Sequence, residues 1–316
     1  MAGPRNWAPL DWIVAGYTAW IALLIVAFWD RFRTPGTLLA AHAGILVFLW
    51  GLPRRGGAWE RPRRRETPVE IAVRFLLRFL RYTYPLLLAL FFFEEAQQTV
   101  RVVYPDHPFW FETWLFAFDK AVFGAEPVQL LAPWSTPALD ELMHALYFSY
   151  YVTICFGPIF AFFGPRREMP PAPGFETVMT ALMTSYLLAY LWYPFLPARG
   201  PWEHPEAVGN LAPFHGYFFT DAIQSIIGAA SVSGACFPSG HAAGAWGASF
   251  GLMRRYPRGG AVVAFITAGM SVACVYTRYH HAADVAAGFI MAVIGAWISW
   301  RLTPSPAEEA RSAAGG

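Results

Sequence analysis

The sequence predicts an all-α integral membrane protein, a polytopic bundle of about six to eight transmembrane helices. Hydrophobic residues make up 56% of the 316 residues and charged residues only 14%. An ordinary soluble domain is about 25% charged. The mean hydropathy is +0.36, and the apolar residues gather into runs long enough to span a bilayer. Composition, hydropathy and run length thus predict the same fold class.

Eight apolar runs are candidate membrane helices. They cover residues 12–29, 38–52, 82–98, 139–163, 175–196, 239–253, 260–279 and 282–300. The second and the sixth are short for a bilayer core of about 30 Å. The first run begins near the N-terminus, as a signal peptide would. It is about 18 residues long and no small-residue cleavage site follows it, so we expect it to remain as a span.

Residues 67–81 carry a different pattern. Arg74, Arg78 and Arg81 recur there every three or four residues within an apolar sequence. A basic amphipathic helix of this kind suits the membrane surface. We therefore expect a surface helix directly before the third run.

The distribution of basic residues predicts the orientation. The net charge is only +2, which gives no reason to expect a nucleic-acid partner. With the N-terminus inside, 14 basic residues fall in the inner segments and six in the outer ones, in agreement with the positive-inside rule. We expect a cytoplasmic N-terminus in a plasma membrane, which in a bacterium is the inner membrane.

This topology brings three polar segments to the same outer side. Arg199 follows the fifth run, His241 opens the sixth, and Arg278 and His280 close the seventh. Ionisable groups at membrane depth are costly, so a cluster of them there marks a functional site.

His280 and Asp284 are four residues apart. If this stretch is helical they share a face, and the carboxylate holds one imidazole nitrogen while the other stays free to attack. Two other interpretations are a structural His–Asp hydrogen bond and a metal site of His280, His281 and Asp284. Neither accounts for the neighbouring arginines, which attract an anion. His281 is expected to point away from His280. The three cysteines lack the spacing of metal ligands.

The other two segments favour an anion as well. The fork of the Arg199 guanidinium suits phosphate oxygens. Ser239 and Gly240 begin a helix whose free N–H groups can hold an anion, and His241 would reach that anion as a proton donor. Alternatively, Arg199 is an interfacial arginine that reaches lipid head groups, and His241 is an interfacial histidine on a capped helix.

Together the segments resemble the type 2 phosphatidic acid phosphatase superfamily of lipid phosphatases and phosphotransferases over roughly residues 175–300. The sequence Pro238-Ser239-Gly240-His241 matches the second motif of that family, and His280-x-x-x-Asp284 matches the end of its third. The resemblance implies a core of the family's fold, His280 as the nucleophile that becomes phosphohistidine, Asp284 as its orienting group and His241 as the proton donor. It also implies that the phosphate is bound by Arg199, Ser239, Gly240 and Arg278.

The sequence departs from the family pattern at two motifs. Trp192 replaces the usual lysine of the first motif, and Gly200 is inserted between arginine and proline. Ala273 and Cys274 replace Ser-Arg in the third, with Arg278 one helical turn later. This variant looks like the branch of inositol-phosphoryl-ceramide synthase-type transferases, in which alcohols often accept the phosphoryl group. Lys120 is either a substitute for the missing lysine or an interfacial lysine.

We therefore expect a membrane lipid-phosphate phosphatase with its active site on the outer face and with no metal or cofactor. Its partner is a lipid phosphate in the bilayer. The alternatives are a phosphotransferase that moves a phospho-head group onto another lipid or an alcohol, and a non-catalytic lipid-binding protein on the same scaffold. We expect a membrane hairpin with a basic cytoplasmic loop at 1–66, a catalytic membrane domain at 67–303 with its motifs at 175–300, and a disordered tail at 304–316.

Overall fold

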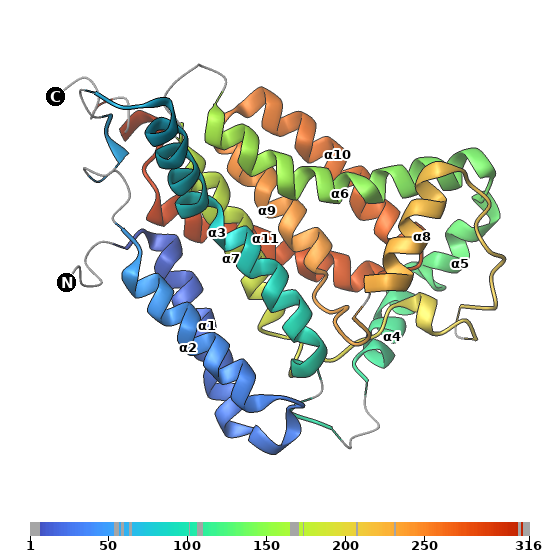
Figure 1. The fold of residues 1–316 in the computed structure, drawn as a ribbon. Coiled ribbons are helices and arrows are strands. Elements are labelled where there is room, and N and C mark those ends of the chain that lie inside the picture. The colour runs from blue at the N-terminus through green and yellow to red at the C-terminus, as the bar shows by residue number, and fades with distance from the viewer. Residues whose placement is uncertain are drawn as a thin grey trace.

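The computed structural model of the chain is a bundle of α-helices (Figure 1). It describes residues 7–311 apart from residues 54–56, 58, 59, 63, 64, 101, 106–109, 165–170, 173, 207, 231, 309 and 310. The α-helices are α1 (Pro9–Ala27), α2 (Pro35–Gly51), α3 (Pro68–Thr99), α4 (Glu112–Phe123), α5 (Pro127–Leu131), α6 (Pro137–Phe163), α7 (Phe175–Tyr190), α8 (Phe218–Ala230), α9 (Gly240–Arg255), α10 (Pro257–Tyr276) and α11 (Ala282–Leu302). Short 3-10 turns lie at η2 (Trp29–Arg31), η4 (Ala132–Trp134) and η5 (Pro201–Glu203).

The predicted fold class is confirmed, and each of the eight apolar runs corresponds to a helix. Within the described residues, five helices are long and apolar enough to cross a membrane: α1, α3, α6, α10 and α11. Helices α2, α7 and α9 are shorter, at 17, 16 and 16 residues. Nearly every residue of α7 and most residues of α9 are buried, so these two helices form the centre of the bundle.

Small residues let α7, α9 and α11 approach closely. A methyl group added at Gly244 of α9 would lie 2.3 Å from the Tyr186 ring of α7, and one added at Gly251 would lie 2.7 Å from the Val178 Cα. Gly295 of α11 makes a similar approach to Ser185. In a membrane, where lipid tails are as apolar as leucine, such close backbone packing is a main source of helix association.

Gly244→Ala should lower the stability of this centre. The new methyl group has to displace a buried tyrosine ring, and overpacking of this kind costs about 1–3 kcal/mol. Thermal unfolding of the purified protein in detergent measures the loss. Gly16→Ala in α1 is the matched control, because no atom lies within 4 Å of its added methyl group. Equal unfolding midpoints for the two variants would contradict this packing.

The expected boundary between a surface helix at 67–81 and a span at 82–98 is wrong. Both belong to α3, one helix of 32 residues. The arginines that suggested a surface helix are paired within the protein: Arg78 with Glu60 at 2.8 Å and Arg81 with the buried Asp11 of α1 at 2.7 Å. The basic stripe therefore holds α3 against its neighbours.

The short helices α4, α5 and α8 gather at the end of the bundle opposite the chain termini (Figure 1). The loops that carry the sequence motifs are tied together here. Ala198 donates its N–H to Gly234 O at 3.0 Å, and Trp202 donates its N–H to Arg278 O at 2.9 Å. A methyl group at Gly200 would lie 2.4 Å from Tyr279 O, so the inserted glycine allows this contact.

Parts of two sequence predictions lie outside the described residues. In the predicted cytoplasmic loop, the structure does not describe Arg54, Arg55, Arg63 and Arg64. In the predicted tail, it does not describe residues 309, 310 and 312–316. Within the tail, residues 306–308 are helical.

Candidate active site

His280 and Asp284 are hydrogen-bonded, but not across a helix face. Helix α10 ends at Tyr276 and α11 begins at Ala282, so His280 lies in the turn between them. The Asp284 carboxylate reaches back from the first turn of α11. Its Oδ1 lies 3.0 Å from His280 Nδ1, and its Oδ2 accepts the His281 N–H at 2.9 Å. Asp284 therefore caps α11 and orients His280 at the same time.

His241 lies in the first turn of α9 and contacts His280 directly. Its Nδ1 is 3.1 Å from His280 Nε2, and its Nε2 is 2.9 Å from the Tyr147 hydroxyl of α6. With Asp284 ionised and both histidines neutral, one proton arrangement satisfies every bond. Tyr147 donates to His241 Nε2, His241 Nδ1–H donates to His280 Nε2, and His280 Nδ1–H donates to Asp284. Both histidines are then neutral, and the lone pair of His280 Nε2 points away from Asp284.

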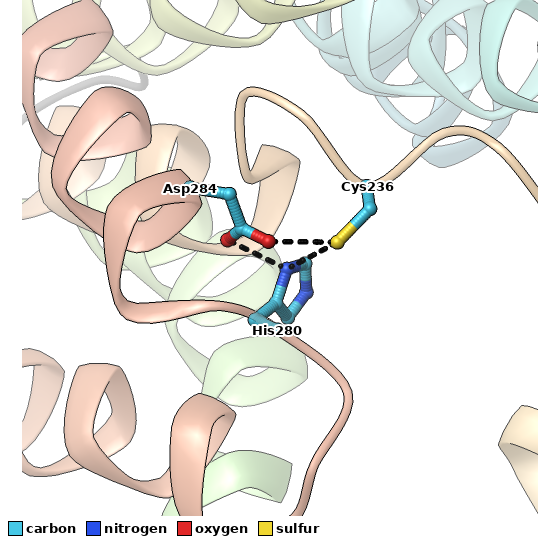
Figure 2. A group of neighbouring side chains, drawn as sticks. All are labelled: Cys236, His280 and Asp284. Atoms are coloured by element: carbon cyan, nitrogen blue, oxygen red, sulfur yellow. Dashed lines mark hydrogen bonds and ion pairs between the residues drawn. The ribbon is translucent and has the colours of Figure 1, made fainter. Parts of the chain in front are cut away.

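Cys236 completes this buried group. Figure 2 shows its sulfur and the His280 ring both turned toward the Asp284 carboxylate. Sγ lies 2.7 Å from Asp284 Oδ2 and 3.5 Å from His280 Nδ1. Burial raises the pKa of the Cys236 thiol well above its usual value, so the sulfur keeps its proton and donates it to the carboxylate. The three side chains could also hold a metal ion, although each is already in hydrogen-bond contact with another.

Ser239 and Gly240 are placed as the sequence suggests, at the start of α9. The buried Ser239 hydroxyl accepts the Ala242 N–H at 3.2 Å, and the Ser239 N–H is donated to Asp284 O at 3.1 Å. A methyl group at Gly240 would lie 3.0 Å from the Tyr193 hydroxyl. These contacts fix the α9 N-terminus beside α11.

Arg199 lies on a cavity of about 390 Å³ rather than against the histidine rings. Its guanidinium pairs with Glu112 at 2.7 Å and stacks 4.3 Å from the centre of the Trp110 ring. His204 shares the same Glu112 oxygen at 3.1 Å. The cavity is lined by Trp110, Glu112, Thr113, Phe116, Glu126, Arg199 and His204.

The Arg278 side chain follows another direction. Its backbone has a positive φ of 68°, and its guanidinium donates to the Leu211 and Ala212 carbonyls and stacks on Phe214 at 4.1 Å. The expectation that Arg278 would follow Cys274 by one helical turn is wrong, because α10 ends at Tyr276. Lys120 is exposed on α4.

His281 is turned away from His280, as expected. Its Nε2 lies 3.1 Å from Arg199 O, and burial lowers the pKa of its ring. The alternative metal set of His280, His281 and Asp284 is therefore not assembled. Sequence reasoning missed Tyr147, Cys236 and Glu112, for which no spacing or motif gives a signal.

Tyr147→Phe should slow the reaction by about 10-fold in kcat. Without its hydroxyl, the part-buried His241 Nε2 loses its donor, and an acceptor left unsatisfied away from water costs about 1–3 kcal/mol. The proton then shifts between the two His241 nitrogens. Tyr151→Phe is the control, since that hydroxyl on the same helix is not hydrogen-bonded to His241 within the described structure. Equal kcat values for the two variants would exclude a positioning role for Tyr147.

A family model described as the PAP2 superfamily matches residues 113–298, more than half of the chain. The match begins well before residue 175 and thus also includes α5 and α6, the second of which carries Tyr147. No curated protein and no solved structure matches the chain. The chain therefore belongs to the PAP2 superfamily, that of the type 2 phosphatidic acid phosphatases.

Proposed function

We propose that the protein is a membrane lipid-phosphate phosphatase that forms a covalent phosphohistidine on His280 and needs no metal for the reaction. Members of the PAP2 superfamily are phosphoesterases or phosphotransferases, and the long apolar helices suit a substrate held in the bilayer. The observation that carries the proposal is the hydrogen-bonded chain from Tyr147 through His241 and His280 to Asp284.

In the first step, the His280 Nε2 lone pair attacks phosphorus. The P–N bond forms while the P–O bond to the lipid alcohol breaks. His241, which carries a second proton once the phosphate anion is bound beside it, gives one proton to the departing oxygen, so the lipid leaves as an alcohol. Asp284 accepts the Nδ1–H of His280 and stabilises the positive charge that grows on this ring. The enzyme then holds the phosphoryl group on His280 and a neutral His241.

In the second step, His241 takes a proton from water. The hydroxide oxygen bonds to phosphorus, the P–N bond breaks, and phosphate leaves with His280 neutral and His241 protonated as it was before the first step. Since His241 Nδ1 and His280 Nε2 are only 3.1 Å apart, the two rings have to separate to admit the phosphoryl group.

We assign the phosphate oxygens to the N-terminus of α9, at Ser239 and Gly240, and to Arg199 and Arg278. Free N–H groups at a helix start and arginine forks are the usual partners of phosphate. Arg199 faces a cavity but is paired with Glu112, and it would have to leave this carboxylate to reach the phosphate. Arg278 is bonded to the Leu211 and Ala212 carbonyls and would have to turn from them to reach the phosphate.

A direct test is a screen of phosphatidate, isoprenyl pyrophosphate, a sphingolipid phosphate and phosphatidylglycerophosphate with the purified protein. Phosphate release and new lipid products are both measured. Vanadate, which mimics the five-coordinate phosphoryl group, should inhibit the active combination. The proposal fails if all four substrates stay intact with a folded protein.

Transfer to an alcohol is the second candidate. This candidate is favoured by Ala273 and Cys274, which occupy the positions where hydrolytic members of the family have Ser-Arg. In the screen, a transferase consumes labelled phospholipid, makes a new phospholipid only when an alcohol is added, and releases little free phosphate. Free phosphate without any added alcohol identifies hydrolysis.

We also propose that the site faces the outer side of the membrane with the N-terminus in the cytoplasm. The excess of arginine in the opposite loops supports this orientation. Reporter fusions at residues 165–170 and at the C-terminus should both report a cytoplasmic position. If either reporter lies outside the cytoplasm, the proposed membrane orientation is wrong.

A further inference from the structure

A second group of buried polar side chains lies beside the start of α11. Asp119 of α4, Glu126 just before α5 and His281 just before α11 each offer a ligand atom, and these atoms lie within 4.8 Å of one another. The three residues are only 0%, 8% and 1% exposed. Glu126 also lines the cavity of about 390 Å³, which gives a small ion a route from outside.

The His281 ring presents an unused lone pair. Its Nε2 lies 3.1 Å from the Arg199 carbonyl, which can only accept, so Nε2 carries the proton. In the neutral ring Nδ1 is then a pure acceptor. It is buried and has no hydrogen-bond partner within the described structure. An acceptor in this position is satisfied by a proton donor or by a metal ion.

The two carboxylates leave room for a cation as well. Asp119 accepts the N–H groups of Ala282 and Ala283, both at 2.8 Å, and each oxygen keeps a further lone pair. The Glu126 carboxylate makes no hydrogen bond or ion pair within the described residues. Lys120 acts on Glu126 electrostatically, but its side chain is exposed. Two buried carboxylates so close together need positive charge or a proton.

We propose that Asp119, Glu126 and His281 bind one divalent transition-metal ion of the zinc type. One imidazole nitrogen and two carboxylate oxygens form a donor set that zinc accepts, with bonds of about 2.0–2.2 Å. Tetrahedral ligands on such an ion stand about 3.4 Å apart, so the three atoms, which lie within 4.8 Å of one another, have to approach by about 1.4 Å at most. The His281 Nε2–H bonded to a backbone carbonyl is the usual support of a metal-bound histidine.

This ion would hold α4 and the start of α5 to the N-terminus of α11, the helix whose first turn carries Asp284. It is separate from the phosphoryl reaction, in which no step uses it. It is also distinct from Cys236, His280 and Asp284, the other group of potential ligands. Only the group with Cys236 contains a thiol, so the absorption spectrum of a bound metal ion shows which of the two groups holds it.

The test uses the full chain in detergent micelles, without a polyhistidine tag and stripped of metal. Cobalt(II) is added as the visible probe and zinc as its competitor. Wild type should bind one cobalt ion per chain, without a thiolate-to-cobalt absorption band, and zinc should displace it. Glu126→Gln keeps the shape of the side chain but removes its charge. This substitution should weaken cobalt binding by more than about 100-fold. Loss of a group that only supports a metal ligand from outside costs up to about 100-fold in affinity, so a larger loss identifies Glu126 as a ligand.

Two further variants make the result specific. Asp221→Asn removes an exposed carboxylate of α8 and should bind cobalt as wild type does, as should Cys236→Ser. Zinc should raise the unfolding temperature of wild type and Asp221→Asn but not of Glu126→Gln, whose metal-free unfolding temperature shows whether it folds. Absence of binding to folded wild type would mean that a shared proton satisfies the cluster. Undiminished binding by Glu126→Gln, or a thiolate band lost in Cys236→Ser, would also overturn the proposal.

Discussion

His280→Ala should abolish turnover of every lipid phosphate that the wild type uses, with a fall in kcat of about 10⁴-fold or more. Removal of a nucleophile that acts within a hydrogen-bonded unit costs about as much as removal of the whole unit. The variant also removes the acceptor of the His241 proton in the resting site. The rate of phosphate release, measured at saturating substrate, checks the prediction.

The matched control is His215→Ala, which removes an exposed histidine from the loop before α8. This variant should retain the wild-type rate. Unfolding temperatures of both variants separate loss of chemistry from loss of fold. Undiminished function in the His280 variant would instead favour a non-catalytic lipid-binding protein on the family scaffold.

His241→Ala should have an effect that depends on the leaving group. With an alkyl lipid phosphate, the departing alkoxide needs a proton, and loss of a positioned acid costs about 10²- to 10⁴-fold. With p-nitrophenyl phosphate the product leaves as a stable anion, so the loss in the rate of this first step should be less than about tenfold. The comparison is made on the rate of the first step, measured as the release of alcohol or p-nitrophenolate in a single turnover with the same enzyme preparation.

The ratio of the two losses is the informative quantity. His280→Ala should lose activity toward both substrates alike, because the nucleophile is needed whatever group leaves. An equal loss for both substrates in His241→Ala would show that His241 positions His280 and does not donate the proton.

Much of the fold could be predicted from the sequence because lipid offers the backbone no hydrogen-bond partners. A long apolar stretch such as residues 137–163 has to be helical to satisfy its backbone. The predicted break in α3 was wrong for a related reason. Arginines within an apolar sequence favour a surface position only when they lack partners, and Arg81 has one in Asp11, from a distant part of the chain.

The candidate site could be predicted only in part. Short-range spacing placed His280 beside Asp284, although the contact arises from a helix cap and not from a helix face. The direction of Arg278 could not be derived, since it depends on where α10 ends. Tyr147 and Cys236 reach the histidines through the packing of α6 and of the loop before α9, which no local pattern encodes.

In the proposed reaction, His280 carries the phosphoryl group between the two steps. The most direct measurement is to quench the enzyme during turnover of a substrate labelled in its phosphate, then locate the label by mass spectrometry of peptides. Phosphohistidine is labile in acid and stable in base, so the quench is alkaline. We predict label on His280 in wild type and none in His280→Ala. With labelled p-nitrophenyl phosphate, whose departure needs no acid, His241→Ala should carry more label than wild type because it lacks the base for the second step. Turnover of the substrate with label on no residue, or on a residue other than His280, would contradict the account.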